Sequence, residues 1–157
     1  MKIIILIVLL ASLIAGCSAT GSKYKPLDTI DSEHALIYIY RPGTYTLSAH
    51  KAEFEFDGDA VGSLSNNGYM YIVTKPGKHK LTHQWSKEFW TEVEERKKVE
   101  LEVVAERNRP AYIEIVADSW STYDRMTNSE VRHQEWILRQ VSAEKGQKKI
   151  KNCRLNN

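Results

Sequence analysis

The five histidines of this sequence are its best candidates for binding a metal ion. His79 and His83 are the closest pair, in a stretch whose apolar residues alternate as in a β-strand. Residues four apart on a strand share a face but lie about 13 Å apart, whereas Zn²⁺ needs ligand atoms about 2 Å from one centre. His34, His50 and His133 fall in predicted loops or strand edges. We therefore expect no metal site, and a backbone hydrogen bond from His79 that fixes its turn.

The sequence also lacks the usual patterns of nucleophilic and acid–base catalysis. Gly62-Ser63-Leu64-Ser65-Asn66 has no second glycine to complete a nucleophile elbow, and no helix is expected to follow it. Glu92, Glu94 and Glu95 belong to a run that is charged throughout, as at the solvated end of a hairpin. A phosphate-binding glycine loop is absent. We expect no catalytic residue and no cofactor.

Cys17 is the residue whose surroundings predict a covalent modification. After Lys2, residues 3–15 are apolar except for Ser12, and a helix of that length spans roughly 20 Å, short of the ~30 Å core of a bilayer. Leu13-Ile14-Ala15-Gly16-Cys17 has the form of a bacterial lipobox, in which the thiol accepts a diacylglycerol and cleavage leaves Cys17 as the N-terminus. The alternatives are cleavage by an ordinary signal peptidase, or an unprocessed buried helix with an incidental thiol at Cys17.

These residues predict three segments. Residues 1–16 form a lipoprotein signal peptide, residues 17–33 a lipid-anchored flexible tether, and residues 34–157 the folded domain. The tether is small and polar at its start, although part of it could instead pack on the domain. Bacterial lipoproteins often stay in the inner membrane when aspartate follows the lipidated cysteine. Ser18 therefore resembles the signal for the outer membrane, facing the periplasm, in a Gram-negative cell.

The charge and the second cysteine exclude further classes. The net charge is +2 including Lys2, and residues of both signs are mixed along the chain, so we expect no clustered basic face and no nucleic-acid partner. With Cys17 bearing lipid, Cys153 is left alone, and it is either buried or paired with another chain. We favour burial. An unmodified Cys17 would be free to pair with Cys153.

Stretches with a period of two predict an all-β domain. Ala35–Tyr40 is apolar on both faces, as in a central strand. In residues 51–56, Ala52, Phe54 and Phe56 face inwards and the charged residues face water. Residues 99–103 and 111–117 are expected to pair across the turn at Arg107–Pro110. Further strands are predicted at residues 60–65, 69–73 and 79–85, with turns at Asp57-Gly58, Asn67-Gly68 and Pro76-Gly77.

The C-terminal part mixes signals. Residues 120–129 have no period and are expected to form a loop. Residues 134–141 fit a helix or a last strand, and we favour the strand. Ser142 is a plausible N-cap for a short helix over residues 143–153, which Gly146 weakens. We expect an antiparallel β-sandwich of about seven strands, with this helix covering one open end.

At Ala35–Pro42 the chain resembles a bacterial lipoprotein family known only by a domain of unknown function. Its further motifs occur here in the same order, and the resemblance covers most of residues 35–155. It implies a β-sandwich lipoprotein and no particular activity. The motifs are Asp57-Gly58, Gly62-Ser63-Leu64, Asn67-Gly68-Tyr69, Pro76-Gly77-Lys78-His79, Leu138-Arg139-Gln140-Val141-Ser142 and Glu144-Lys145-Gly146.

The aromatic residues carry the remaining functional signal. Tyr69 and Tyr71 alternate on a predicted strand, and core packing is the simpler interpretation for all of the aromatics. Trp90, Trp120 and Tyr123 lie near predicted turns, where exposed rings could stack on sugars or anchor a protein. We therefore expect a non-catalytic envelope lipoprotein that binds an envelope protein or glycan. The alternatives are a structural or stress lipoprotein without a specific ligand and, less favoured, a hydrolase with an unrecognised site.

Overall fold

The computed structural model describes residues 18–27, 30–45, 47–85 and 98–156. Cys17, the predicted signal peptide and Trp90 lie outside these residues. Within them, no helix has both the length and the apolar character needed to cross a membrane.

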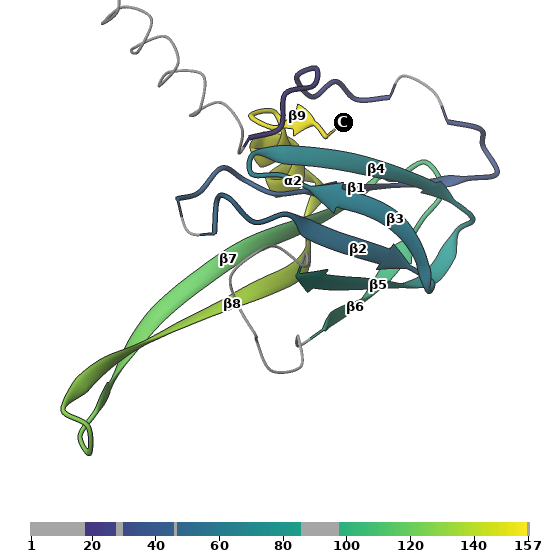
Figure 1. The fold of residues 1–157 in the computed structure, drawn as a ribbon. Coiled ribbons are helices and arrows are strands. Elements are labelled where there is room, and N and C mark those ends of the chain that lie inside the picture. Colours follow the sequence, from purple (N-terminus) through teal and green to yellow (C-terminus); the bar gives the residue numbers. More distant parts are fainter. Residues whose placement is uncertain (1–17, 28–29, 46, 86–97, 157) are drawn as a thin grey trace, which may run out of the picture.

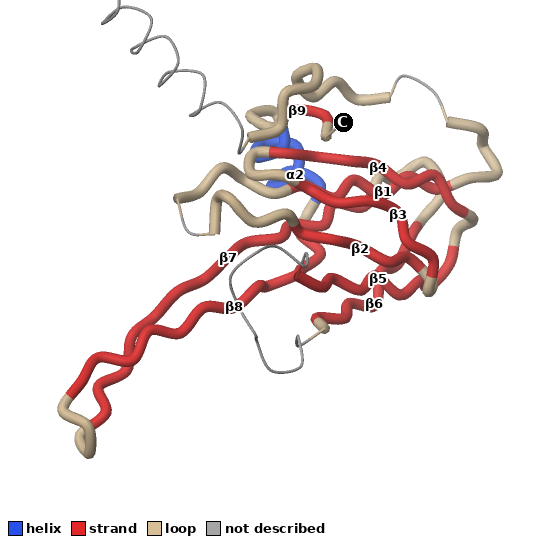
Figure 2. The backbone as a smooth tube through the Cα atoms, in the orientation of Figure 1, coloured by secondary structure: helices blue, strands red, loops and turns tan. Residues whose placement is uncertain are grey.

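Two sheets packed face to face make up the domain, which confirms the predicted all-β sandwich (Figure 2). One sheet has five strands in the order β8-β7-β1-β4-β9, and the other has four in the order β3-β2-β5-β6. Two pairings, β1 with β7 and β4 with β9, are parallel, whereas an antiparallel fold is expected from the sequence. The strands are β1 (Ala35–Tyr40), β2 (Ala52–Phe56), β3 (Asp59–Leu64), β4 (Gly68–Thr74), β5 (Gly77–Trp85), β6 (Val99–Ala105), β7 (Ala111–Asp124), β8 (Ser129–Val141) and β9 (Arg154–Leu155).

The main core lies between the sheets and follows the predicted alternation. Ile37 and Ile39 of β1 face Phe54 of β2 and Leu81 of β5 across it, all almost completely buried. Leu36, Tyr38 and Tyr40 of β1 are buried on the opposite face. The central-strand prediction for Ala35–Tyr40 is therefore confirmed, because both faces of β1 are covered.

The expected pairing of residues 99–103 with 111–117 is wrong. β6 pairs with β5 in the smaller sheet, and β7 crosses to the larger sheet, where it lies between β1 and β8. The turn at Arg107–Pro110 therefore connects the two sheets. The turn at Pro76-Gly77 also connects them, from β4 to β5. Alternation along a strand identifies its buried face, but it does not specify which strand lies next to it.

The C-terminal helix, α2 (Ala143–Ile150), covers the outer face of the five-stranded sheet rather than an open end of the sandwich. The Ser142 hydroxyl accepts the amide N–H of Lys145, as expected of an N-cap. Ile150 and Cys153 are completely buried with the outward tyrosines of β1, so the predicted burial of Cys153 is confirmed. The helix lies there because the outer face of β1 is itself apolar and needs covering.

The start of the expected tether is docked on the domain. The Ala19 amide donates to Asn66 O at 3.0 Å, the Gly21 amide to Leu155 O at 3.2 Å, and the Tyr24 amide to Cys153 O at 3.1 Å. The side chains of Ala19 and Tyr24 are buried. The alternative interpretation, that part of this segment packs on the domain, therefore describes residues 18–24. These residues have no apolar period, and backbone hydrogen bonds hold them on the domain.

Candidate functional site

The hairpin of β7 and β8 extends well beyond the sandwich (Figure 1). These strands pair from Tyr112, opposite Val141, to Asp124, opposite Ser129. β1 pairs with β7 only as far as Glu114. We call residues 118–135 the arm. The prediction of a loop at residues 120–129 is wrong, except for the turn between Asp124 and Ser129. With no core on either side, the arm needs no apolar period, and its Trp, Thr, Tyr and Val residues suit a strand.

The tip of the arm is closed by its own hydrogen bonds. Asp124 Oδ1 accepts the amide N–H of Met126 at 2.8 Å, and Asn128 adopts a left-handed φ of 52°. The hydrogen bonds from Met126 and Thr127 lower the pKa of Asp124. This turn returns the chain directly into β8.

Trp120 and Tyr123, both predicted as partner-binding residues, lie on this arm but on opposite faces. Residues paired across an antiparallel ladder share a face, so Trp120 and its partner His133 lie together, and Tyr123 lies with Glu130. The Trp120 and His133 rings stack with centroids 5.3 Å apart, and His133 Nε2 lies 2.7 Å from Thr122 Oγ1. The arm therefore presents an aromatic side chain to each side.

Several apolar side chains on the arm are exposed to water. Met126 is 96% exposed, Tyr123 62%, Trp120 43% and Val131 39%. Met126 and Val131 are not predicted from the sequence as exposed apolar residues, because each stands alone in a polar stretch and no local pattern distinguishes such residues from core residues. Among the other predicted aromatics, Tyr69 is buried as expected, whereas Tyr71 is 45% exposed on β4.

His79 links the turn before β5 to the β2–β3 hairpin. Its Nδ1 lies 2.7 Å from Asp57 Oδ2 and its Nε2 lies 2.8 Å from Lys75 O. Burial lowers the pKa of His79, but the bonds to Asp57 and to Lys75 outweigh it, so the pKa is raised overall. The predicted backbone bond is present, together with a carboxylate partner. Nowhere in the described part of the chain do three or more His, Cys, Asp or Glu side chains gather as metal ligands would.

Two charged residues, Arg41 and Glu114, are completely buried, which no local pattern in the sequence predicts. The Arg41 guanidinium donates to the backbone oxygens of His50 and Leu47, holding the loop before β2, and it lies 4.6 Å from the Trp136 ring centroid. Glu114 accepts hydrogen bonds from Arg139 and Lys149, the latter in α2. Their positions resemble those of ordinary strand residues in the sequence, so only the tertiary structure identifies them.

Two hollows bordered by described residues offer no reactive group. One of about 410 Å³ is bordered by Asn67, Lys149 and Cys153. Burial, followed by the charge of Glu114, raises the pKa of the Cys153 thiol to about 12, which opposes thiolate formation. Burial raises the pKa of Glu114, but the hydrogen bonds from Lys149 and Arg139 outweigh burial. The pKa of Glu114 is therefore lowered, and its carboxylate stays ionised.

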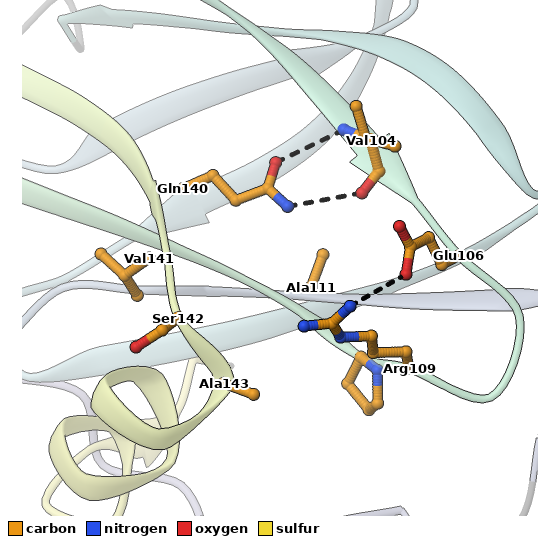
Figure 3. A pocket seen from close by; sticks show the side chains of 9 residues that line it. Val104, Glu106, Arg109, Ala111, Gln140, Val141, Ser142 and Ala143 are labelled. Carbon is orange, nitrogen blue, oxygen red and sulfur yellow. Dashed lines mark hydrogen bonds and ion pairs between the residues drawn. The ribbon is translucent and has the colours of Figure 1, made fainter.

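The second hollow, of about 170 Å³, lies where β8 approaches the edge of β6 (Figure 3). The Gln140 amide bonds both backbone groups of Val104, donating to its oxygen and accepting from its nitrogen, each at 3.4 Å. Arg109 Nη1 lies 3.4 Å from Glu106 Oε2 beside them. The two bonds between Gln140 and Val104 join the edges of the two sheets, so the Gln140 amide is already used in closing the sandwich.

Comparison with known proteins gives one match. The family model described as "Protein of unknown function (DUF2846)" matches residues 31–125, which include β1 to β7. No curated protein and no solved structure matches the chain. The match supports the expected domain of unknown function.

Proposed function

The chain belongs to this protein family of unknown function, and from that premise we propose that it is a lipid-anchored, non-catalytic protein of a bacterial cell envelope whose arm binds a second envelope component. The anchor is a diacylglycerol and a further acyl chain on Cys17. The arm's partner is a protein or a glycan. Ser18 after the lipidated cysteine favours the periplasmic face of the outer membrane in a Gram-negative cell.

The observation that carries this proposal is the exposure of Trp120, Tyr123 and Met126 on an arm that no other described element covers. Aromatic residues and methionine are enriched at protein interfaces, and aromatic rings also stack on sugars. An arm without such a role would be expected to carry polar side chains at these positions.

The position of the arm relative to the anchor supports a partner close to the membrane. Tyr40, the last residue of β1, pairs with both Tyr69 and Glu114. The arm therefore leaves the sheet at the end where β4 begins. Asn66, just before β4, holds Ser18, the residue next to Cys17. The proposed anchor and the arm thus start from one end of the sheet.

Photo-crosslinking in the native envelope tests the arm. A photoreactive phenylalanine analogue replaces Tyr123 in one variant and Tyr71, a half-exposed tyrosine on β4, in the control. We expect a discrete crosslinked species from position 123 that is absent from position 71, and that is lost when Trp120→Ala and Met126→Ala are added. Equal, diffuse labelling from both positions would favour the passive structural alternative.

Intact mass tests the anchor independently. Protein purified from its own membranes should match residues 17–157 plus a diacylglycerol and one acyl chain, and Cys17→Ala should lose this mass addition. An unmodified chain of residues 17–157 in the soluble fraction would contradict lipidation without bearing on the arm.

A further inference from the structure

The docked N-terminal segment leaves almost no spacer between the proposed lipid and the folded domain. Ser18 Oγ donates to Asn66 O at 3.1 Å, and Ala19, at 6% exposure, is already packed into the domain. Cys17 is one peptide unit away, so its Cα lies about 3.8 Å from that of Ser18. A lipid on Cys17 would hold this end of the sandwich directly at the bilayer.

The segments around this attachment point are strongly basic. Residues 18–27 and 142–156 together contain seven lysines and arginines but only one acidic residue, Glu144. The whole sequence has a net charge of only +2, so the rest of the chain is net negative. The mixing of charges expected along the chain therefore does not hold for these two segments. The two segments are hydrogen-bonded side by side, with Lys23 bridged to Arg154 and Arg154 Nη1 donating to Gly21 O.

The basic side chains of α2 face outwards. Gly146 and Ile150 are buried against the sheet, whereas Lys145, Lys148 and Lys151 are exposed. At 100° per residue, these three lysines lie on the side of the helix opposite Gly146 and Ile150. Lys149 is different because it is paired with buried Glu114 and fixes the helix in place. We define the basic surface as Lys23, Lys25, Lys145, Lys148, Lys151 and Arg154.

We propose that this basic surface lies against an anionic lipid membrane and orients the domain on it, an inference that rests on the proposed lipidation of Cys17. The physical basis is charge complementarity at the point where the chain is tethered. A basic side chain near an anionic leaflet strengthens binding about fivefold, and a basic patch is a common second signal beside a lipid chain. The arm, which leaves the same end of the sheet, is then held in a fixed orientation near the membrane.

Vesicle sedimentation tests the basic surface apart from the lipid. The protein used is residues 17–157 with Cys17→Ser, which retains every described strand and helix, and circular dichroism checks that it is folded. We expect it to sediment with vesicles of phosphatidylglycerol and phosphatidylcholine but not with phosphatidylcholine alone. Binding should weaken sharply between about 0.1 M and 1 M salt, because the Debye length falls from ~10 to ~3 Å.

A matched pair of triple variants locates the binding. Lys145→Gln, Lys148→Gln and Lys151→Gln together should weaken binding roughly a hundredfold, at about fivefold per residue. Lys75→Gln, Lys78→Gln and Arg107→Gln remove the same charge from exposed positions at the other end of the sheet and should leave binding within about threefold of the parent. Equal loss in both variants, equal binding to neutral vesicles, or no binding by the parent would each overturn the proposal.

The outcome is separable from the test of the anchor. Absence of vesicle binding, with the lipid mass on Cys17 present, would overturn this inference and leave the proposed anchor intact. If the triple α2 variant instead loses a crosslinked acidic protein in the envelope while the parent ignores anionic vesicles, the surface serves a protein and the membrane proposal is wrong.

Discussion

Gly146 in α2 and Tyr112 in β7 approach so closely that a β-carbon at position 146 would lie 2.3 Å from Cγ of Tyr112. The Tyr112 ring is itself fixed, being buried and stacked on Tyr38 with centroids 5.4 Å apart. Gly146 looks like a weakness in the helix when only the sequence is read. In the structure it is the residue that allows α2 to lie on the sheet.

We predict that Gly146→Ala destabilises the protein although alanine favours helices by about 1 kcal/mol over glycine. Crowding of a packed core costs about 1–3 kcal/mol, so after the helix gain is subtracted the free energy of unfolding should fall by up to about 2 kcal/mol. Urea unfolding measures it. The control is Gln147→Ala, at an exposed position of the same helix, which should leave stability unchanged or slightly raised. A stabilised Gly146→Ala variant would contradict the packing of α2 on Tyr112.

The buried imidazole of His83 predicts a loss of stability in mild acid. His83 is completely buried, and its Nδ1 lies 3.0 Å from Glu53 O. Burial, together with the nearby charge of Arg41, outweighs the backbone bond to Glu53 and lowers the pKa of His83 to about 4. In the unfolded chain its pKa is about 6.5. Between these values the unfolded chain binds a proton that the folded chain does not, so stability falls as the pH drops from about 6.5 to 4.

This contribution should total about 3 kcal/mol. It is measured as the difference in unfolding free energy between the parent and His83→Gln, which should shrink over this pH range. His79→Gln is the matched control. The raised pKa of His79 gives a contribution that is fully present below about pH 6.5 and is lost as the pH rises through the folded pKa, so its difference should not shrink on mild acidification. Parallel pH profiles for the parent and His83→Gln would show that His83 is not buried as a neutral group.

Glu114 is predicted to anchor α2 to the sheet. Its carboxylate is completely buried and pairs with both Arg139 and Lys149. Arg139 Nη2 lies 2.7 Å from Glu114 Oε2. Removing one partner of a fully buried pair costs about 3–5 kcal/mol, but the Arg139 and Lys149 side chains are 44% and 39% exposed and water can solvate them. We therefore expect Glu114→Gln to lower the unfolding free energy by about 2 kcal/mol. Glu102→Gln, which removes an exposed partner of Lys78, should produce no measurable change. An equal effect of the two substitutions would mean that Glu114 is not a buried anchor.

Local patterns in the sequence are enough to predict the core strands and the helix cap. Alternation in residues 51–56 identifies Ala52, Phe54 and Phe56 as inward-facing because burial on one face imposes a period of two. Ser142 is recognised because an N-cap needs a side-chain acceptor directly before the helix. Each of these features depends on residues close together in the sequence.

The candidate site depends on relationships that sequence patterns do not contain. The arm has no core to face, so Trp120–Asp124 carries no period although it is a strand. The basic surface is completed when Lys23, from the start of the chain, is brought beside Arg154 near its end. In the sequence Arg41 lies where a strand is expected to end, and nothing there indicates burial. It is buried because the loop of Leu47 and His50 folds over it. What could be predicted at the site is therefore the identity of Trp120 and Tyr123, and not their arrangement.

Cys153 should be nearly inert to thiol reagents in the folded protein. It is completely buried between α2 and the sheet, its Sγ donates to Arg41 O at 3.7 Å, and burial raises the pKa of its thiol to about 12. Thiolate is the reactive form, so alkylation at about pH 8 requires α2 and its C-terminal turn to open first.

Mass spectrometry of timed alkylation, in residues 17–157 carrying Cys17→Ser, measures this opening. Thr127→Cys provides the reference thiol, because position 127 is exposed at the tip of the arm and should react at the rate of an unfolded thiol. We expect Cys153 to react at least about a hundredfold more slowly than the reference thiol in the folded protein, and equally fast in urea, since opening a packed element costs several kcal/mol. Gly146→Ala should accelerate the reaction of Cys153 and not that of the reference thiol, because it loosens the helix that covers Cys153. Equal rates at the two positions in the absence of urea would place Cys153 at the surface and would reopen its pairing with Cys17.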